Sequence, residues 1–375
     1  MVDDLVKKNT EKITVNDSEK TDTQNQVLFK ISNLGKAFGE HVVLNNVNIE
    51  IKQGEIFGII GKSGSGKTTF LSILIGFIRP DAGDVKFKEE HLIEYKSDDA
   101  FVSVIKKGSN IKKLCGFAAQ IPSFYPELTV KENLEYFGSL HGLSKEALRI
   151  NMATLLKLMD LEEYKNLRAA NLSGGMERRL DIACSLIHDP KILILDEPTA
   201  DLDPLLRNQI WNLIKKVNKK GTTIIIASHH LEEIEVLCSR IGILHEGSII
   251  SVGTMAEIKD KFSPNIEIQL HSFPGDYKEI SNIKHQDIIS SEITDTSLII
   301  YTAKPEKVLY DLLDRMESLK EKLVDVRVKK PSLDEIFIQI AQKDEKEKKK
   351  KEETDEKISN KKIKDALSDK EKFGL

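Results

Sequence analysis

The sequence has 375 residues, of which 40% are hydrophobic and 31% are charged, and its net charge is −4. These values favour a folded chain with one large and one smaller domain, and they exclude a general nucleic-acid binder, which would carry a strongly basic surface. The three cysteines, Cys115, Cys184 and Cys238, are odd in number and far apart. We therefore expect reduced thiols in a cytosolic protein rather than a disulfide or metal site.

The N-terminal segment, residues 1–26, is polar and lacks the apolar stretch of a secretory signal, so we expect it to be disordered. No apolar run approaches the roughly 18 residues of a membrane-spanning helix. The richest run, FLSILIGFI at 70–78, fits a buried helix. We therefore expect the chain to act on a membrane only by docking to another protein.

A strand, a glycine-rich loop and a helix follow this segment. Strand patterns run through VLFKISNLGKAFG and VVLNNVNIEIKQGEIFGIIG, and Gly54 and Glu55 divide the second into two strands. The loop GKSGSGKT, Gly61–Thr68, fits G-x-x-x-x-G-K-[ST], in which main-chain N–H groups close around phosphate oxygens. Lys67 would reach the β- and γ-phosphates of a nucleotide, and the Thr68 hydroxyl would hold Mg²⁺.

The middle of the chain contains a second candidate anion site. Residues 88–113 are charged and weakly patterned, which predicts a surface elaboration, whereas residues from about 121 to 187 have a helical pattern. The helix beginning at LSGGMERRLDIA has Ser173 as a good N-cap. The two glycines after it leave N–H groups open at the positive end of the helix dipole. This region therefore predicts a phosphate cradle far from the first one.

Two later strands end in residues suited to nucleotide chemistry. KILILDEPTADLDP predicts a buried parallel strand that ends in Asp196 and Glu197. Two such carboxylates cost desolvation energy unless a cation faces them, and Mg²⁺ at Thr68 would face Asp196. Glu197 is then placed to act on water as a general base. TTIIIASHH predicts a second strand, whose His229 lies at the ligand-binding edge of such sheets and could contact the γ-phosphate.

Further patterns complete the chain. Gln120, after GFAA, lies on a loop entering the helical region, where an amide can orient water or complete a metal shell. IGILHEGSIISVG predicts a hairpin turning at Glu246 and Gly247. Residues 263–341 predict a small α+β domain with the strands NIEIQLH, SLIIYT and KLVDVRVKK and the helices KPEKVLYDLLDRMESLKEK and PSLDEIFIQIAQ. Residues 343–375 predict a mixed-charge tail, either disordered or a solvated helix.

Together, the motifs resemble those of the nucleotide-binding domain of ABC ATPases over about residues 28–253. The resemblance implies an α/β, P-loop NTPase core at 27–253, with a helical subdomain at about 121–187 and an antiparallel β subdomain. The matching nucleotide-binding positions are the adenine-stacking aromatic residue Phe38, which as a bare residue would be assigned to the core, and Gly61, Lys62, Ser63, Gly64, Ser65, Gly66, Lys67, Thr68 and Thr69.

The same resemblance assigns the other sites. The catalytic positions are Lys67, Gln120 of the Q-loop, Glu197 and the switch histidine His229, and the metal positions are Thr68, Gln120 and Asp196. The signature motif is Leu172, Ser173, Gly174, Gly175 and Met176, and the D-loop is Ala200, Asp201, Leu202 and Asp203. Met176 replaces the usual Gln, and ADLDP replaces the usual Gly-Leu-Asp-Pro of the D-loop, but neither change removes a phosphate ligand or the base.

The resemblance explains the second phosphate cradle. In this family two domains face each other head to tail, and the signature of one grips the ATP held by the phosphate loop of the other. We therefore expect a second ATP-binding subunit, either the same chain or a related one. ATP would close this dimer and hydrolysis would open it, which can drive work elsewhere.

The predicted function is that of an ATP-hydrolysing, Mg²⁺-dependent subunit of an ABC transporter. LSGGMERRLDIA, DEPTADLDP and PSLDEIFIQIA resemble the exporter branch of drug-resistance-type and nodulation-type subunits. A separate transmembrane permease is then implied, with this chain cytoplasmic and peripheral on the inner face of the cell membrane. The alternative is a soluble ABC-type ATPase acting on ribosomes, DNA or an assembly complex. Ribosome-acting members usually carry two such domains, whereas this chain has one. DNA-tethering members divide the motifs with a long coiled coil, and no such pattern lies here between Lys67 and Asp196.

Overall fold

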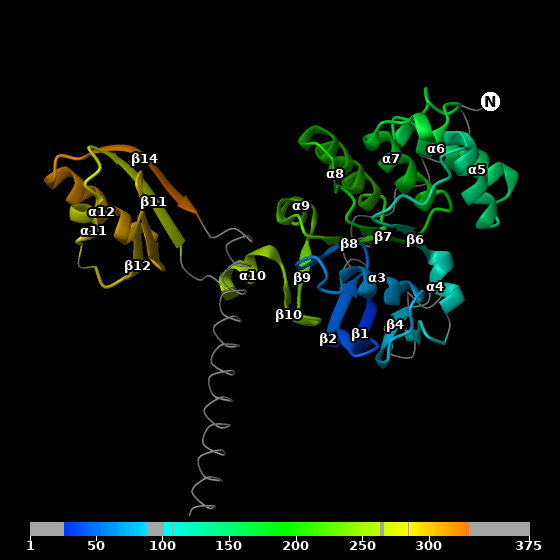
Figure 1. The fold of residues 1–375 in the computed structure, drawn as a ribbon, viewed down its shortest axis with the longest axis horizontal. Coiled ribbons are helices and arrows are strands. Elements are labelled where there is room, and N and C mark those ends of the chain that lie inside the picture. The colour runs from blue at the N-terminus through cyan, green and yellow to red at the C-terminus, as the bar shows by residue number, and fades with distance from the viewer. Residues whose placement is uncertain are drawn as a thin grey trace, which may run out of the picture. The chain divides into compact units, whose positions relative to one another are not determined.

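The computed structural model describes residues 26–88, 101–106, 108–200, 202–262, 266–283 and 285–329. The chain divides into two compact units, residues 1–255 and 256–375, coloured blue to green and yellow-green to orange in Figure 1. Three predictions lie outside the described residues: those for residues 1–25, for the charged tail and for the helix PSLDEIFIQIAQ.

The first unit contains an antiparallel sheet with the strand order β2-β1-β4-β5. Its strands are β1 (Val27–Phe38), β2 (His41–Lys52), β4 (Ala82–Lys88) and β5 (Phe101–Ser103). After β2 the chain turns through Gly54, whose φ is 73°, and continues as β3 (Ile56–Ile60) in a different sheet. The division predicted at Gly54 and Glu55 is therefore confirmed, and it separates two sheets as well as two strands.

The second sheet of this unit has the order β10-β9-β3-β8-β7-β6. Its strands besides β3 are β6 (Cys115–Ala118), β7 (Ile192–Asp196), β8 (Thr223–Ser228), β9 (Arg240–His245) and β10 (Ser248–Gly253). All pairings are parallel except the hairpin β9–β10, whose turn residues Glu246 and Gly247 have φ values of 45° and 75°. The predicted hairpin is confirmed, whereas β6 was not predicted.

Helices cover the parallel sheet. They are α3 (Lys67–Ile75), α4 (Gly108–Leu114), α5 (Val130–Leu140), α6 (Lys145–Leu158), α7 (Gly174–Leu186), α8 (Pro204–Asn218) and α9 (Leu231–Leu237), with a 3₁₀ turn at Ala169–Asn171. Helix α10 (Met255–Phe262) follows β10 in the chain and begins the second unit. Figure 1 shows α5 and α6 beside α7 at the β6 side of the sheet, as the helical subdomain prediction expects. Local signals set the ends: Thr129 and Glu132 form a reciprocal capping box at the start of α5.

The main hydrophobic core joins α3, the antiparallel sheet and one face of the parallel sheet. Phe29, Phe57 and Phe70 are fully buried in it. Val104 and Ile111 belong to the same core, with exposed fractions of 2% and 0%. The interpretation of residues 88–113 as surface elaboration was therefore wrong for this part, because β5 extends the antiparallel sheet and Ile111 of α4 reaches the core.

The second unit contains an antiparallel sheet with the order β12-β13-β11-β14. The elements are β11 (Ile266–Phe273), α11 (Tyr277–Ser281), β12 (Ile288–Ile293), β13 (Leu298–Thr302), α12 (Pro305–Ser318) and β14 (Lys322–Lys329). Its core contains Ile268, Leu270, Ile300 and Leu312. The three predicted strands and the helix α12 are confirmed, and β12 and α11 are additional. Within the described residues, no helix is long and apolar enough to cross a membrane.

Candidate active site

The phosphate loop lies between β3 and α3, as the motif predicts. Gly66 precedes α3 with a φ of 103°, a conformation that a side chain would strain. A Cβ atom on Gly61 would lie 2.3 Å from the carbonyl oxygen of Leu244, so the loop needs glycine there as well. The Lys67 ammonium is buried and donates to the carbonyl oxygens of Gly61 and Lys62 at 2.9 and 3.2 Å. The loop thus curls around its own cation.

The end of β7 brings Asp196 to this loop. The Thr68 hydroxyl donates to Asp196 Oδ2 at 2.7 Å, while Asp196 Oδ1 is buried without a hydrogen-bond partner. Burial raises the pKa of Asp196, and the hydrogen bond from Thr68 opposes this effect. The Ser65 hydroxyl is also buried without a partner. Hydroxyl and carboxylate oxygens are the ligands that Mg²⁺ prefers, so these residues fit that ion.

Glu197 lies at the centre of the predicted catalytic residues. Its side chain is only 7% exposed, and its Oε1 lies 3.6 Å from Lys67 Nζ. Its Oε2 accepts from His229 twice, from Nδ1 at 2.8 Å and from the main-chain N–H at 3.2 Å. An ionised carboxylate can only accept, so Nδ1 carries the proton in this pair. The ion pair and the two hydrogen bonds hold the carboxylate in one orientation.

Phe38 and Gln120 lie outside this hydrogen-bonded cluster. Phe38 ends β1 with 51% of its surface exposed, and Lys36 Nζ lies 5.2 Å from the centre of its ring. The alternative of a core phenylalanine is therefore wrong. Gln120 is exposed and directly follows Ala119, after the end of β6. Among the described residues, no hydrogen bond joins Gln120 to Asp196 or Glu197.

The signature motif begins α7, and its start is open. Ser173 occupies the N-cap position, but its side chain makes no capping hydrogen bond. A Cβ atom on Gly174 would meet nothing within 4 Å, whereas one on Gly175 would meet Leu206 of α8 at 2.8 Å. The first turn of a helix leaves main-chain N–H groups without intrahelical partners. These donors face outward beside Ser173 and Gly174, which are exposed.

The D-loop connects β7 to α8. Asp203 caps α8 by accepting from the N–H groups of Leu205 and Leu206 at 2.9 and 3.0 Å. Asp201 lies outside the described residues. Thr199, just before the loop, donates to the fully buried Glu233 at 2.8 Å. Glu233 lies on α9, shortly after His229, and burial raises its pKa. This contact ties the D-loop to the helix that follows the switch histidine.

The sequence interpretation missed a buried pair on α7, Arg178 and Asp181. Their charged atoms are 3.2 Å apart and their side chains are 7% and 0% exposed. Burial lowers the pKa of Arg178 and raises the pKa of Asp181, so each charge is costly to hold there. The only sequence signal was a pair of opposite charges three residues apart, next to the apolar face of the helix.

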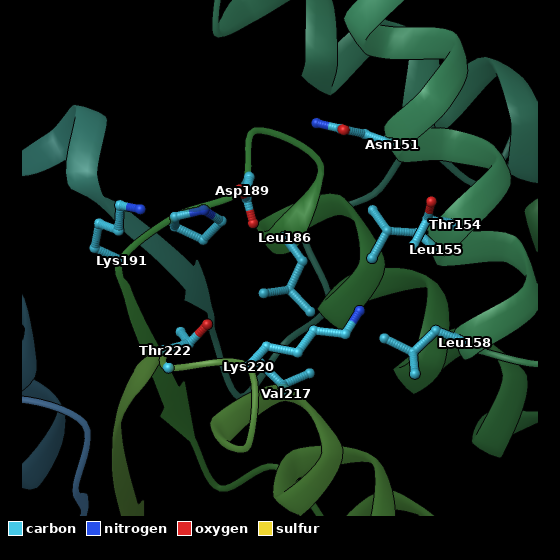
Figure 2. A pocket seen from close by; sticks show the side chains of 12 residues that line it. Asn151, Thr154, Leu155, Leu158, Leu186, Asp189, Lys191, Val217, Lys220 and Thr222 are labelled. Carbon is cyan, nitrogen blue, oxygen red and sulfur yellow. The ribbon is translucent and has the colours of Figure 1, made fainter. Parts of the chain in front are cut away.

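A separate cavity of about 250 Å³ lies between α6, the end of α7 and the end of α8. Figure 2 shows the Lys220 side chain extending between Val217 and Leu158, with Asp189 on a loop above. None of the predicted nucleotide-binding residues lines this cavity. It is therefore distinct from the candidate active site.

Comparisons with known proteins agree with this geometry. The ABC transporter family matches residues 44–200, and the C-terminal domain of DrrA1-3-like ATP-binding proteins matches residues 253–341. Linearmycin resistance ATP-binding protein LnrL of Bacillus subtilis is 30% identical, over 84% of this chain and 98% of its own length. Nod factor export ATP-binding protein I of a Rhizobium species is 31% identical, over 84% and 97%.

Solved structures give the same result. The ATP-binding cassette MJ0796, in a dimeric post-hydrolysis state bound to ADP and Pi, is 30% identical with a TM-score of 0.52, and the match covers 61% of this chain and 99% of that one. CbiO1 of Clostridium perfringens, part of an ABC transporter complex, is 27% identical with a TM-score of 0.55, covering 63% and 94%. The resemblance to the drug-resistance and nodulation branch is confirmed, and the chain belongs to the family of ABC transporter ATP-binding proteins.

Proposed function

We propose that this chain hydrolyses ATP and, as one of two ATP-binding subunits, powers export through a separate transmembrane permease. The observation that carries the proposal is the cluster of Lys67, Glu197 and His229, next to the pair Thr68–Asp196. An ammonium at 3.6 Å and an imidazole at 2.8 Å hold one buried carboxylate beside a phosphate loop. A general base needs this combination of fixed orientation and proximity to the phosphate.

The residues divide the chemistry among themselves. Phe38 presents an aromatic face for adenine, and the N–H groups of Gly64–Thr69 surround the phosphates. Lys67 would exchange the carbonyl oxygens of Gly61 and Lys62 for phosphate oxygens. Glu197 would accept the proton of the attacking water, and His229 keeps the carboxylate oriented.

The metal site belongs to the same proposal. Thr68 and Asp196 would hold Mg²⁺, with Gln120 completing its shell. The unpartnered Oδ1 of Asp196 supports this assignment, because a buried acceptor without a donor is suited to a cation. When bound, Mg²⁺ neutralises part of the charge on the phosphates.

The open start of α7 supports a role for a second subunit. Ser173, Gly174 and Gly175 would bind the nucleotide held by the other subunit and stabilise the charge that develops on its γ-phosphate. We assign the chain to the cytoplasmic face of the membrane, where its relatives' role as export ATP-binding proteins would place it. No nucleic acid is part of this function.

The test uses a tagged Glu197→Gln variant, incubated with ATP and recovered from detergent-solubilised native membranes. In this variant a glutamine amide replaces the proposed general base, so bound ATP should not be hydrolysed. The ATP-bound dimer should therefore stay closed. Co-purification of a polytopic membrane protein supports the proposal and identifies the permease. Recovery of ribosomes or soluble partners alone rejects the transport role and favours the soluble alternative. A Lys67→Ala variant is the control, because it should recover no closed dimer.

A further inference from the structure

The Arg178 guanidinium, on the helix that the signature motif begins, contacts two further segments that the proposed function needs, the residue before Gln120 and the Asp196–Pro198 stretch. It lies in the second turn of α7, after the signature motif, with its side chain only 7% exposed. It donates five hydrogen bonds: Nε to Pro198 O at 2.8 Å, Nη1 to Ala119 O at 2.7 Å and Asp181 Oδ2 at 3.2 Å, and Nη2 to Asp196 O at 3.0 Å and Glu197 O at 3.1 Å. A guanidinium has five N–H groups in a rigid plane, so few other side chains could make this set.

Four of these acceptors are main-chain carbonyl groups at or just beyond the ends of strands. Ala119 follows β6 and directly precedes Gln120. Asp196 and Glu197 are the carboxylates at the end of β7, and Pro198 continues that loop. Carbonyl groups at the ends of strands have left the sheet ladder and need other donors when buried. Arg178 supplies these donors to two neighbouring strands at once.

The backbone of Glu197 is held from both sides. Its φ is 49°, a left-handed conformation that costs a residue other than glycine about 1 kcal/mol or more. Its N–H donates to Ala227 O of β8 at 2.8 Å, and its carbonyl accepts from Arg178. This conformation sets the direction in which the Glu197 carboxylate leaves the strand. Without Arg178, the Glu197 carbonyl would keep only the longer hydrogen bond from the Ala200 N–H at 3.3 Å, besides the contact of its own N–H to β8.

Asp181 extends the connection beyond Gln120. It balances the charge of Arg178, and its Oδ1 accepts from the N–H and hydroxyl groups of Ser123 at 2.9 and 3.2 Å. The loop that carries Gln120 is thus fastened to α7 on both sides, at Ala119 and at Ser123. A buried ion pair is a poor way to gain stability, because apolar residues of similar size often do as well. The number of site-forming groups it contacts suggests a role in orientation.

We propose that Arg178 is a positioning residue that makes the signature start of α7, the backbone of Glu197 and the loop of Gln120 into one rigid unit. This inference rests on the proposed ATPase function. Ser173–Gly175 would touch the nucleotide of the other subunit, while Glu197 acts on the nucleotide of its own. A shift of α7 on contact with the second nucleotide would therefore move the backbone of Glu197 directly. Each catalytic carboxylate becomes sensitive to the nucleotide across the dimer.

The neighbouring Arg179 provides a matched control. It lies on the same helix and also makes several polar contacts: to Met159 O at 3.2 Å, to Gln209 and to Asp160 at 3.5 Å. None of these partners belongs to a nucleotide-binding motif. Arg178→Met and Arg179→Met therefore remove similar side chains from one helix, and only the first loses contact with the site.

The experiment measures kcat and KM for ATP, ATP affinity at equilibrium and the thermal midpoint for the purified full chain. For Arg178→Met we expect kcat to fall about 10- to 100-fold with KM and ATP affinity changed less than about threefold, because small misplacements of a catalytic group cost this much. Arg179→Met should keep kcat within about threefold of the wild type, whatever its loss in thermal midpoint. Arg178→Lys keeps the charge without the planar fork, so its kcat should be intermediate.

Several results would overturn the inference. Wild-type kcat in Arg178→Met is one, and equal losses of kcat in Arg178→Met and Arg179→Met are another, since they would indicate a purely structural role. If Arg178→Met does not fold, Arg178→Lys decides: wild-type kcat in that variant shows that the fork has no positioning role. A wild-type chain that binds ATP without hydrolysing it rejects the proposed function instead.

Discussion

The helices α3 and α7 both begin beside glycines, and their surroundings differ. At the start of α3, Lys67 is buried and lies 3.6 Å from Glu197, and Thr68 donates to Asp196. At the start of α7, Ser173 caps nothing and a side chain on Gly174 would enter open space. The N-terminus of α3 is surrounded by catalytic groups of the same chain, and we call it the closed helix start. The N-terminus of α7 faces outward, and we call it the open helix start.

The difference indicates where each helix is held. The N-terminus of α3 is fixed by the site itself, through the glycines and β7. The N-terminus of α7 is fixed on its buried side, by the hydrogen bonds of Arg178 in its second turn and by the packing of Gly175 on Leu206. An open helix start on a rigid support is what recognition of an external anion requires. The predictions below test this distinction.

The largest effect should come from Glu197→Gln, at the closed helix start. An amide cannot accept the proton of water, so ATP hydrolysis should fall about 10²- to 10⁴-fold. ATP binding should persist, because the phosphate loop is untouched. Phosphate release and equilibrium binding of ATP measure the two quantities. Hydrolysis near the wild-type rate would remove Glu197 from the role of base.

Ser173→Glu tests the open helix start. An acidic residue at a helix N-terminus is stabilising, so the thermal midpoint should not fall. Its charge would repel the phosphates of a second subunit's nucleotide, and hydrolysis should fall about 100-fold. ATP affinity of the isolated chain should stay unchanged, with Ser173→Ala as the uncharged control. Weakened binding by a monomer would mean that the signature contacts its own chain's nucleotide, and the comparison would fail.

The sequence predicted the residues at the closed start of α3 better than the contacts that hold α7 in place. The phosphate loop, β7, β8 and the β9–β10 hairpin have local signals, such as turn glycines and apolar runs. By contrast, β6 is four residues long and contains Gly116, where a Cβ would lie 2.1 Å from Ser185 O on α7. That glycine records close packing between two segments far apart in sequence, which no local pattern reveals. For β12, mostly exposed side chains erase the alternation that would indicate a strand.

The partners of Arg178 were unpredictable for the same reason. Its acceptors are main-chain carbonyls, which every residue has, so side-chain types carry no signal for them. Exposure was also hard to foresee: Phe38, at the end of a strand pattern, is 51% exposed, whereas Val104, in a charged and weakly patterned stretch, is 2% exposed. The motif residues themselves were found because function fixes their order, and their distances came only with the fold.

Phe38→Ala tests an exposed residue that we propose to stack on the adenine of the chain's own nucleotide. Loss of a stacking face costs about 1 kcal/mol or more per base, so KM for ATP should rise roughly five- to tenfold. The value of kcat should change little, because Phe38 lies outside the cluster around Glu197. Phe77→Ala, at another exposed phenylalanine, is the control. Unchanged KM in Phe38→Ala would show that exposure at this site does not mark nucleotide contact.

The smallest effect concerns the far end of α7, where His188 stacks on His141 with ring centres 3.6 Å apart. Burial lowers the pKa of His188 from 6.5 to about 4, and proximity to His141 adds to this effect. The unfolded chain therefore binds more protons between these values, so stability should fall as pH drops from 6.5 toward 4. Partial exposure of the ring reduces the expected loss between pH 7 and 5 to about 1 kcal/mol.

Urea unfolding of the wild type and of His188→Phe at the two pH values measures this loss. The phenylalanine ring can preserve the stack but cannot titrate or donate to Cys115 O, which His188 Nε2 contacts at 3.2 Å. The variant should be less stable than the wild type at pH 7 and should lose less stability on acidification. His41→Gln, on an exposed strand end, should keep the wild-type dependence. An equal loss in all three proteins would show that the protonation of groups other than His188 sets this pH dependence.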